Sequence, residues 1–220
     1  PGEGDEERAI PAEPGLNKMI WDLKYPDAYL APGVNEGFRD RIAVVTGYTG
    51  GPWALPGTYA VTLRAGGVEQ TRELEVRRDP RLPTTMAELE ESFEFQIRVR
   101  DRITAIQRGV ARGQRAVERL GEVIEESDEA ARVRRAREAR AELEEVLGEL
   151  YKHGERGDHA HLHPELTTSY ARIYTMLAEA DYRPPDSAYE RWDDLQPEYE
   201  ELMGRLEGLL SEDVAEELER

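Results

Sequence analysis

Hydrophobic and polar residues alternate along the first part of the chain with the period of two that a β-strand requires. Apolar runs that fit short strands lie at Asn17–Leu23, Ile42–Thr46, Thr58–Arg64 and Val68–Arg77. The last two runs are separated by Gly66-Gly67, and a pair of glycines is typical of a two-residue hairpin turn. The pattern therefore predicts four short antiparallel strands, the last two of which form a hairpin.

Short antiparallel strands joined by glycine- and proline-rich turns are typical of a small β-sandwich of the immunoglobulin (Ig) type. Four strands are too few to close such a sandwich, so we expect residues 16–78 to form an incomplete Ig-like domain. Its first strand, Asn17–Leu23, then has an unpaired side, which another chain or the N-terminal tail can cover. We expect the residues of this interaction to be Asn17, Met19, Trp21, Leu23, Tyr25 and Tyr29. Residues 1–15 are acidic and rich in proline and glycine, and are expected to be an extended N-terminal segment.

The hydrophobic period changes after the fourth strand. Residues 79–85 contain two prolines and are predicted to be a linker. Thr85 and Glu88 then fit a capping box at the start of a long helix. Along this helix, apolar positions spaced alternately by four and three residues run from Val99 to Ile124, and Gly113 lies among them. This spacing predicts packing against other helices at a shallow angle, with close approach at Gly113.

Three more helices follow from the same kind of pattern. Their expected N-terminal cap or first-turn residues are, in chain order, Ser127 or Asp128, then Pro164, then Ser187 with Glu190. Pro197 is expected to kink or split the last helix. Residues 86–220 are therefore predicted to form an antiparallel helical bundle, and the whole chain to belong to the α+β class.

The composition limits the possible partners. The chain has 47 acidic and 29 basic residues and a formal net charge of −18, which argues against binding to nucleic acid or to an anionic membrane surface. No apolar run approaches the roughly 20 residues that cross a bilayer. The absence of cysteine excludes disulfides and thiol catalysis. We therefore expect other protein subunits as partners, without nucleic acid and without a direct membrane span.

The charges are unevenly distributed along the predicted helices. Residues 98–119 contain seven arginines and only two acidic residues, whereas residues 186–220 contain thirteen acidic residues and three arginines. Two interpretations follow. The basic early helix can pair with the acidic last helix inside the bundle, or the acidic stretch can be a docking surface for a basic partner.

The chain has no motif for nucleotide binding or nucleophilic catalysis, so we predict neither a catalytic residue nor a cofactor. The four histidines all lie within the segment "KHGERGDHAHLHP". In an extended segment His159, His161 and His163 would point to one side and could hold a zinc or copper ion, although their spacing matches no common zinc signature. The alternative is a plain loop between helices.

Aromatic residues gather in the predicted β-domain. They are Trp21, Tyr25, Tyr29, Trp53 and Tyr59. They could form a platform for a carbohydrate or a peptide, or they could fill the core and corners of a thin sandwich.

Three stretches of the sequence resemble a known family. "GLNKMIWDLKYPDAYLAPG", "GPWALPGTYAVTLRAGG" and "VRRDPRLPTTMAEL", together with "HPELTTSYARIYTMLAEADYRPPDSAYE" further on, are similar to the C-terminal region of secreted bacterial proteins that carry a sortilin-like or BNR-repeat β-propeller and are labelled glycosyl-hydrolase-like. In that region an Ig-like domain, related to the module of flagellar hook-capping proteins, leads into helices. The resemblance covers most of residues 15–210. The propeller of those proteins and the earliest strands of their Ig-like domain have no counterpart in this sequence.

The resemblance implies a periplasmic or extracellular location and, because the propeller is absent, no catalytic residue. The leading hypothesis is a non-enzymatic accessory subunit that docks on and stabilises a larger extracytoplasmic assembly, for example the periplasmic side of a respiratory or photosynthetic membrane complex. The alternative is the C-terminal accessory module of a propeller-bearing protein, since the sequence begins at Pro1 and so belongs to a processed chain or to part of a longer one. A weaker alternative is a metal-binding protein that uses the histidine cluster.

Overall fold

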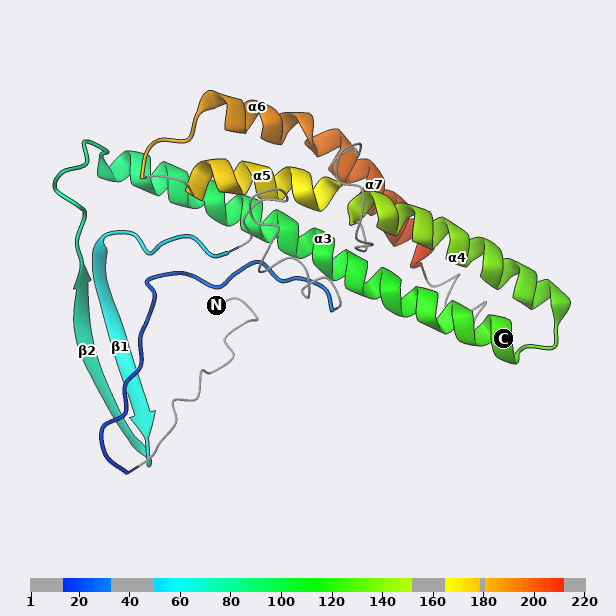
Figure 1. Cartoon of the computed structure of the whole chain (residues 1–220), viewed down its shortest axis with the longest axis horizontal. Helices are drawn as coiled ribbons and strands as arrows, with labels where there is room; N and C mark the ends of the chain where they lie inside the picture. Colours follow the sequence, from blue (N-terminus) through cyan, green and yellow to red (C-terminus); the bar gives the residue numbers. More distant parts are fainter. Residues whose placement is uncertain (1–13, 33–49, 152–164, 179–180, 212–220) are drawn as a thin grey trace, which may run out of the picture.

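The computed structural model describes residues 14–32, 50–151, 165–178 and 181–211, which form a mostly helical chain with one two-stranded antiparallel sheet. The elements are β1 (Gly57–Ala65), β2 (Val68–Val76), α3 (Met86–Glu126), α4 (Ala130–Leu150), α5 (Leu166–Ala178), α6 (Asp186–Asp194) and α7 (Gln196–Leu209). The hairpin projects from one end of the helical part, close to the start of α3 (Figure 1). The mixed α+β class expected from the sequence is confirmed.

The predicted hairpin is also confirmed. β1 and β2 pair in register from Gly57 opposite Val76 to Ala65 opposite Val68. Gly66 and Gly67 make the turn with φ values of 56° and 78°. Both values lie in the left-handed region, where a side chain is strained and glycine is not, so the sequence of the turn determines the register of the hairpin.

The first of the other two expected strands is not a strand. Residues 17–23 have no ladder partner, and Leu23 has a φ of 61°, which turns the chain out of the extended conformation. The segment makes one isolated bridge, between Lys24 and Trp53. The Leu23 carbonyl accepts a hydrogen bond from the Ala54 N–H of a loop, and residues after the run, Tyr29 and Ala31, donate to α3, as described below. The expected strand Ile42–Thr46 lies outside the described residues, so the two paired strands establish the α+β class but not a sandwich.

The start of α3 agrees with the sequence. The Thr85 side chain accepts a hydrogen bond from the Glu88 backbone N–H, and the Glu88 carboxylate accepts one from the Thr85 backbone N–H at 2.7 Å. These hydrogen bonds lower the pKa of Glu88. The reciprocal pairs satisfy donors that a helix leaves open at its first turn, which determines where α3 begins.

The later helices begin differently from the expectation. The N-cap residue of α4 is Glu129, which makes no side-chain capping hydrogen bond, and Ser127 is instead the C-cap residue of α3. α6 follows Pro185, and Ser187 makes no capping box because the helix has already begun at Asp186. Pro164 lies outside the described residues. The expected break near Pro197 is confirmed, since α6 ends at Asp194 and α7 starts with this proline in its first turn.

The helices pack around α3, which is long enough to run through the whole helical part. α4 runs back along its C-terminal half, and α5 lies along its N-terminal half, with α6 and α7 beyond (Figure 1). The largest fully buried side chains are Tyr170, Tyr174, Phe95, Ile103, Ile106, Leu120, Leu143, Leu150, Leu166, Ile173, Leu177 and Leu195. A Cβ atom on Gly113 would lie 2.7 Å from a methyl group of Leu147, which confirms the expected close approach between α3 and α4.

A chain of buried hydrogen bonds joins four segments through Gln107 of α3. The Gln107 carbonyl accepts from the backbone N–H of Ala31 at 3.1 Å, and its amide group donates to Thr167 Oγ1 at 3.1 Å. Thr167 Oγ1 donates in turn to the carbonyl oxygen of Leu150 at 2.9 Å. Gln107 and Ala31 have no exposed surface. The chain therefore ties the N-terminal segment, α3, α5 and the end of α4 together inside the core.

Replacing Gln107 tests how much this connection contributes. Gln107→Leu leaves the Ala31 N–H buried without its acceptor, which costs about 1–3 kcal/mol. We expect the free energy of unfolding to fall by about that amount in urea titrations. Gln114→Leu, a change of the same kind at a half-buried position of α3, should stay within about 0.5 kcal/mol of the parent chain. Equal effects of the two substitutions would contradict a special role for Gln107.

Aromatic rings from three helices surround the guanidinium group of Arg102. Its Cζ atom lies 3.8 Å from the ring centre of Tyr199, 4.7 Å from that of Trp192 and 5.4 Å from that of Tyr170. Its Nη1 atom donates to the Tyr170 hydroxyl at 3.0 Å and to the Gln196 side-chain oxygen at 2.8 Å. Cation–π contacts and hydrogen bonds thus hold α5, α6 and α7 on the N-terminal half of α3.

The environment of Tyr170 predicts how stability changes in alkali. Burial raises the pKa of Tyr170 above its ordinary value of 10.0, although the charge and hydrogen bond of Arg102 act in the opposite direction. The folded state therefore holds this proton more tightly than the unfolded chain. Its contribution is complete below pH 10 and is lost as the pH rises through the folded pKa.

We expect the free energy of unfolding to decline as the pH rises above about 10, and that of Tyr170→Phe to decline less over the same range. Urea titrations at a series of pH values measure both slopes. Parallel declines in the two proteins would contradict the assignment.

Candidate docking surface

The two faces of the hairpin differ in polarity. Residues opposite each other in the register share a face, so Tyr59, Val61, Leu63, Val68 and Leu74 lie on one side of the sheet. We call these five residues the hairpin apolar face. The exposed fractions are 42% for Val61, 54% for Leu63, 61% for Val68 and 39% for Leu74. Arg72 and Gln70 lie opposite Val61 and Leu63 and share this side of the sheet. The hairpin thus presents to solvent a continuous apolar row on β1, beside a β2 row that two polar residues interrupt.

The opposite face is polar and pairs within itself. The hydroxyl groups of Thr62 and Thr71 lie 2.9 Å apart, and Arg64 Nε donates to the Glu69 carboxylate at 2.8 Å. Glu73 lies on the same side of the sheet. A hairpin that is polar on one face and apolar on the other is the arrangement of a sheet whose second face packs against something.

The N-terminal segment covers only the base of the hairpin apolar face. Trp21 packs edge-on against Tyr59, with ring centres 5.4 Å apart. The Tyr59 hydroxyl donates to the carbonyl oxygen of Leu55 at 2.7 Å, and burial raises the pKa of this tyrosine. The remaining residues of the apolar face, toward the hairpin turn, stay exposed.

The structure separates the six residues that the sequence analysis grouped on one strand. Asn17 and Met19 are exposed, and Trp21 lies against the hairpin. Leu23 accepts a backbone hydrogen bond from Ala54. Tyr25 packs edge-on against Phe93 of α3 at 5.0 Å, and the Tyr29 backbone N–H donates to Thr104 Oγ1 of α3 at 3.1 Å. The latter half of the segment is thus attached to α3, and its first residues, among them Met19 and Ile20, are exposed.

A close backbone contact between residues 25–27 and the loop at residues 51–52, which we call the junction, holds the N-terminal segment in this position. The backbone N–H of Tyr25 donates to the Pro52 carbonyl at 2.9 Å, and the N–H of Gly51 donates to the Asp27 carboxylate at 2.8 Å. A Cβ atom on Gly51 would lie 1.7 Å from the carbonyl oxygen of Tyr25. Because that neighbour is backbone, the two segments can approach this closely only when residue 51 is glycine.

The junction makes Gly51→Ala a sensitive test. The added methyl group must push the Tyr25 backbone away, which breaks both hydrogen bonds and detaches the N-terminal segment from the loop. We expect faster hydrogen exchange at Tyr25 and Ala54, measured by NMR or mass spectrometry. Gly57→Ala is the control, because a Cβ atom there meets nothing within 4 Å. Unchanged exchange in Gly51→Ala would contradict this account of the junction.

The aromatic residues do not form one flat platform. Trp53 is half exposed, and the Lys24 ammonium group lies 4.7 Å from its ring centre. Trp21, Tyr25 and Tyr59 are each engaged in the packing described above. These contacts favour the interpretation that most of the aromatic residues fill gaps between segments.

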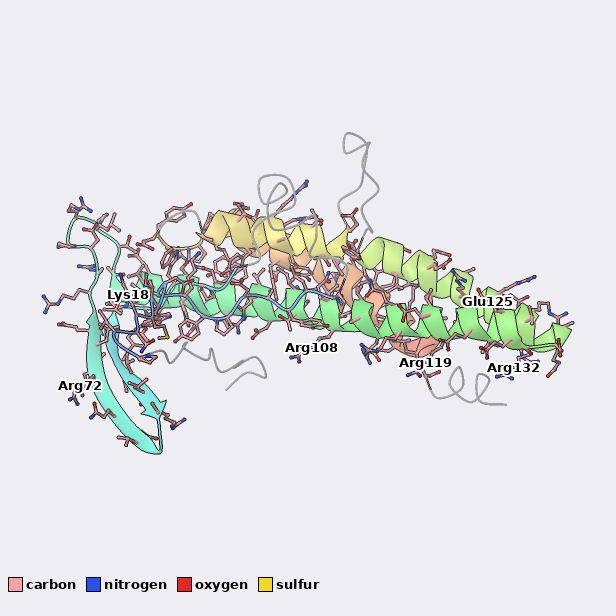
Figure 2. All side chains as sticks on the ribbon, turned by 60° about the horizontal axis from the view of Figure 1, so that its bottom comes forward. Lys18, Arg72, Arg108, Arg119, Glu125 and Arg132 are labelled. Atoms are coloured by element: carbon pink, nitrogen blue, oxygen red, sulfur yellow. The ribbon has the colours of Figure 1, made fainter. Side chains whose placement is uncertain are left out.

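The uneven charge distribution is partly used for contacts between helices. Arg112 of α3 pairs with Glu207 of α7, as the first interpretation of the charges expected. Arg205 of α7 also pairs with Glu145 and Glu149 of α4. Figure 2 shows Arg108 and Arg119 on the same side of α3, away from α4. Surface pairs of this kind contribute little to stability, typically less than about 1 kcal/mol each.

The histidine cluster, with His159, His161 and His163, lies outside the described residues. Within the part of the chain that the structure describes, no group of three or more potential ligands is placed to hold a metal ion. None of the described helices combines the length and the apolar character that a membrane span requires.

Comparisons of the chain with protein-family models, with curated proteins and with solved structures found no match. The candidate site therefore rests on the geometry of the chain itself. Sequence reasoning placed the interaction on residues 17–29, where Met19 and Ile20 are exposed, and the structure adds the hairpin apolar face as a second exposed apolar surface. The signal was present in the alternation at 59, 61 and 63, but whether another sheet covers that face cannot be read from a strand pattern.

Proposed function

We propose that this chain is a non-enzymatic accessory subunit that docks on a larger protein assembly outside the cytoplasm through the hairpin apolar face. The observation that carries the proposal is the exposure of Val61, Leu63, Val68 and Leu74 on one side of a two-stranded sheet. Met19 and Ile20, which are also exposed, extend the apolar surface into the N-terminal segment.

Physical chemistry supports a partner on this face. A two-stranded hairpin is marginally stable in water unless an apolar face packs against another element. Here the hairpin contacts the rest of the described chain mainly through Trp21 and Tyr59 at its base. Covering a half-exposed valine or leucine contributes on the order of 1 kcal/mol each. A docked partner would thus stabilise the hairpin and gain binding free energy from the same contacts.

The finer architecture belongs to the same proposal. A second sheet packed on the hairpin apolar face would complete a sandwich of the Ig type, and the helices around α3 would form the antiparallel bundle that carries it. A periplasmic or extracellular location is part of the same proposal, as the sequence resemblance over most of residues 15–210 implies. One assembly of this kind is a membrane complex, on which the chain would dock from the periplasmic side.

The test compares the native size of the chain with that of a variant whose apolar face has been made polar. Val61→Thr, Leu63→Thr and Leu74→Thr together keep β-branched or polar side chains that suit a strand while removing the apolar surface. We expect the parent chain to elute from native extracts in a particle much larger than 25.0 kDa, and the triple variant to elute alone.

The matched control changes the opposite face. Thr58→Ser and Thr62→Ser should leave the large particle intact, because these residues lie on the polar side of the sheet. Circular dichroism should show the same helical content in all three proteins. A parent chain that elutes as a monomer from the native extract, or a triple variant that stays in the particle, would overturn the proposal.

A further inference from the structure

We infer that the outer edge of β2 binds an extended strand of a partner protein in which basic and apolar residues alternate. This inference rests on the proposed docking function and specifies the partner. It follows from three features of β2: which backbone groups point outward, which side chains accompany them, and what lies beside the strand.

The register determines which backbone groups of β2 are available. In a hairpin with a two-residue turn, the residues that flank the turn, here Ala65 and Val68, exchange hydrogen bonds with each other. Pairs that do so alternate with pairs that do not. The N–H and C=O groups of Glu69, Thr71, Glu73 and Glu75 therefore point away from β1. The close contact between the Thr62 and Thr71 hydroxyl groups agrees with this assignment, because side chains approach most closely in the pairs that are not hydrogen-bonded.

No other strand in the described part of the chain pairs with this edge. β2 pairs with β1 on one side, and the two strands make up the whole sheet of the described residues (Figure 1). All its residues except Val76 are exposed. Figure 2 shows the Arg72 side chain at the outer side of the hairpin, directed away from the helices. The edge is thus a row of open donors and acceptors long enough for a nine-residue strand.

The acidic side chains exclude a second copy of this chain as the occupant. Glu69, Glu73 and Glu75 lie on one face and accompany the outward backbone groups, and exposed ion pairs join Glu69 to Arg64 and Glu75 to Arg77. Antiparallel pairing of β2 with another β2 that uses at least three of the four outward positions places a glutamate opposite a glutamate. Like charges directly opposite each other destabilise a sheet. A partner strand with lysine or arginine at these positions replaces that repulsion with attraction.

The other face of β2 specifies the remaining positions of the partner. Val68, Leu74 and Val76 lie on the apolar side together with Gln70 and Arg72, so the partner residues next to the three apolar ones are apolar. Such a strand would widen the hairpin apolar face while pairing its basic residues with the acidic face. Backbone hydrogen bonds would supply much of the affinity, and the alternation would supply the specificity.

One side chain already occupies part of the edge. Arg72 Nη1 donates to the outward carbonyl oxygen of Thr71 at 3.1 Å. An incoming strand must take over that acceptor, which frees the guanidinium group. Because the contact lies at the surface, its loss costs little compared with a row of new backbone hydrogen bonds.

The probe is a synthetic nine-residue peptide that alternates valine or isoleucine with lysine, in the register opposite residues 68–76. We expect saturable binding in calorimetry and slower hydrogen exchange at the amides of Thr71 and Glu73. A peptide of the same composition in shuffled order should bind at least roughly tenfold more weakly, since it cannot place lysines on one face and apolar residues on the other. Equal binding of the two peptides would overturn the inference.

Two variants locate the binding on the edge. Glu73→Lys with Glu75→Lys should weaken binding by roughly tenfold and favour a peptide in which glutamate replaces lysine, because both cross-strand charge pairs are reversed. Thr71→Pro removes an outward N–H that the hairpin does not use, so it should block binding while circular dichroism of the strands is retained. Undiminished binding in either variant would overturn the inference.

The outcome is independent of the test of the docking function. A chain that elutes in a large native particle but does not bind the alternating peptide overturns the β2 edge site alone. A chain that is monomeric in native extracts overturns the docking function, whatever the peptide does.

Discussion

A glutamine side chain without access to solvent can remain in a helical core only if its carbonyl and its amide group are both paired. Gln107 meets this condition by accepting from Ala31 and donating to Thr167, which itself donates to Leu150. The partners come from the N-terminal segment, α5 and the end of α4, so the glutamine can be buried only when all three are in place. The arrangement of the described segments around α3 depends on this requirement.

The same attachment explains why the hairpin is exposed. The N-terminal segment spends its backbone hydrogen bonds on α3 and on the loop at residues 50–54, and Gly51 keeps that loop within reach of Tyr25. These contacts hold residues 23–31 against the loop and α3, so that part of the segment does not pair with the sheet. β1 and β2 therefore project from the helices with one apolar face and one edge open, and both open features belong to the same small element.

The two open features make different demands on a partner. The hairpin apolar face can be covered by any partner with an exposed apolar patch, and many protein surfaces have one. The partner inferred for the β2 edge is more specific: it is a strand with basic residues at alternate positions, because Glu69, Glu73 and Glu75 lie beside the outward backbone groups of β2. Area provides affinity and the charged edge provides selectivity, so the combination is what an accessory subunit with a defined partner requires.

Local chemistry allowed the sequence alone to determine several elements. The glycine pair at 66–67 established the hairpin and its register, Thr85 with Glu88 established the start of α3, and Pro197 established the break between α6 and α7. Each depends on residues within a few positions of one another. Where two local signals competed, as at Ser187 beside Pro185, the proline that fits the start of a helix prevailed over the capping box.

Only the tertiary structure decided the course of residues 17–31 and the exposure of the hairpin. An apolar run such as Asn17–Leu23 reads as a strand from its pattern, but strand formation needs a partner for its backbone groups. The backbone groups of residues 23–31 found their partners in Pro52, Ala54, Thr104 and Gln107, which are distant in sequence and lie on a loop and a helix. The alternation in β1 likewise predicted an apolar face, whereas whether that face is covered depends on which other segments fold against it.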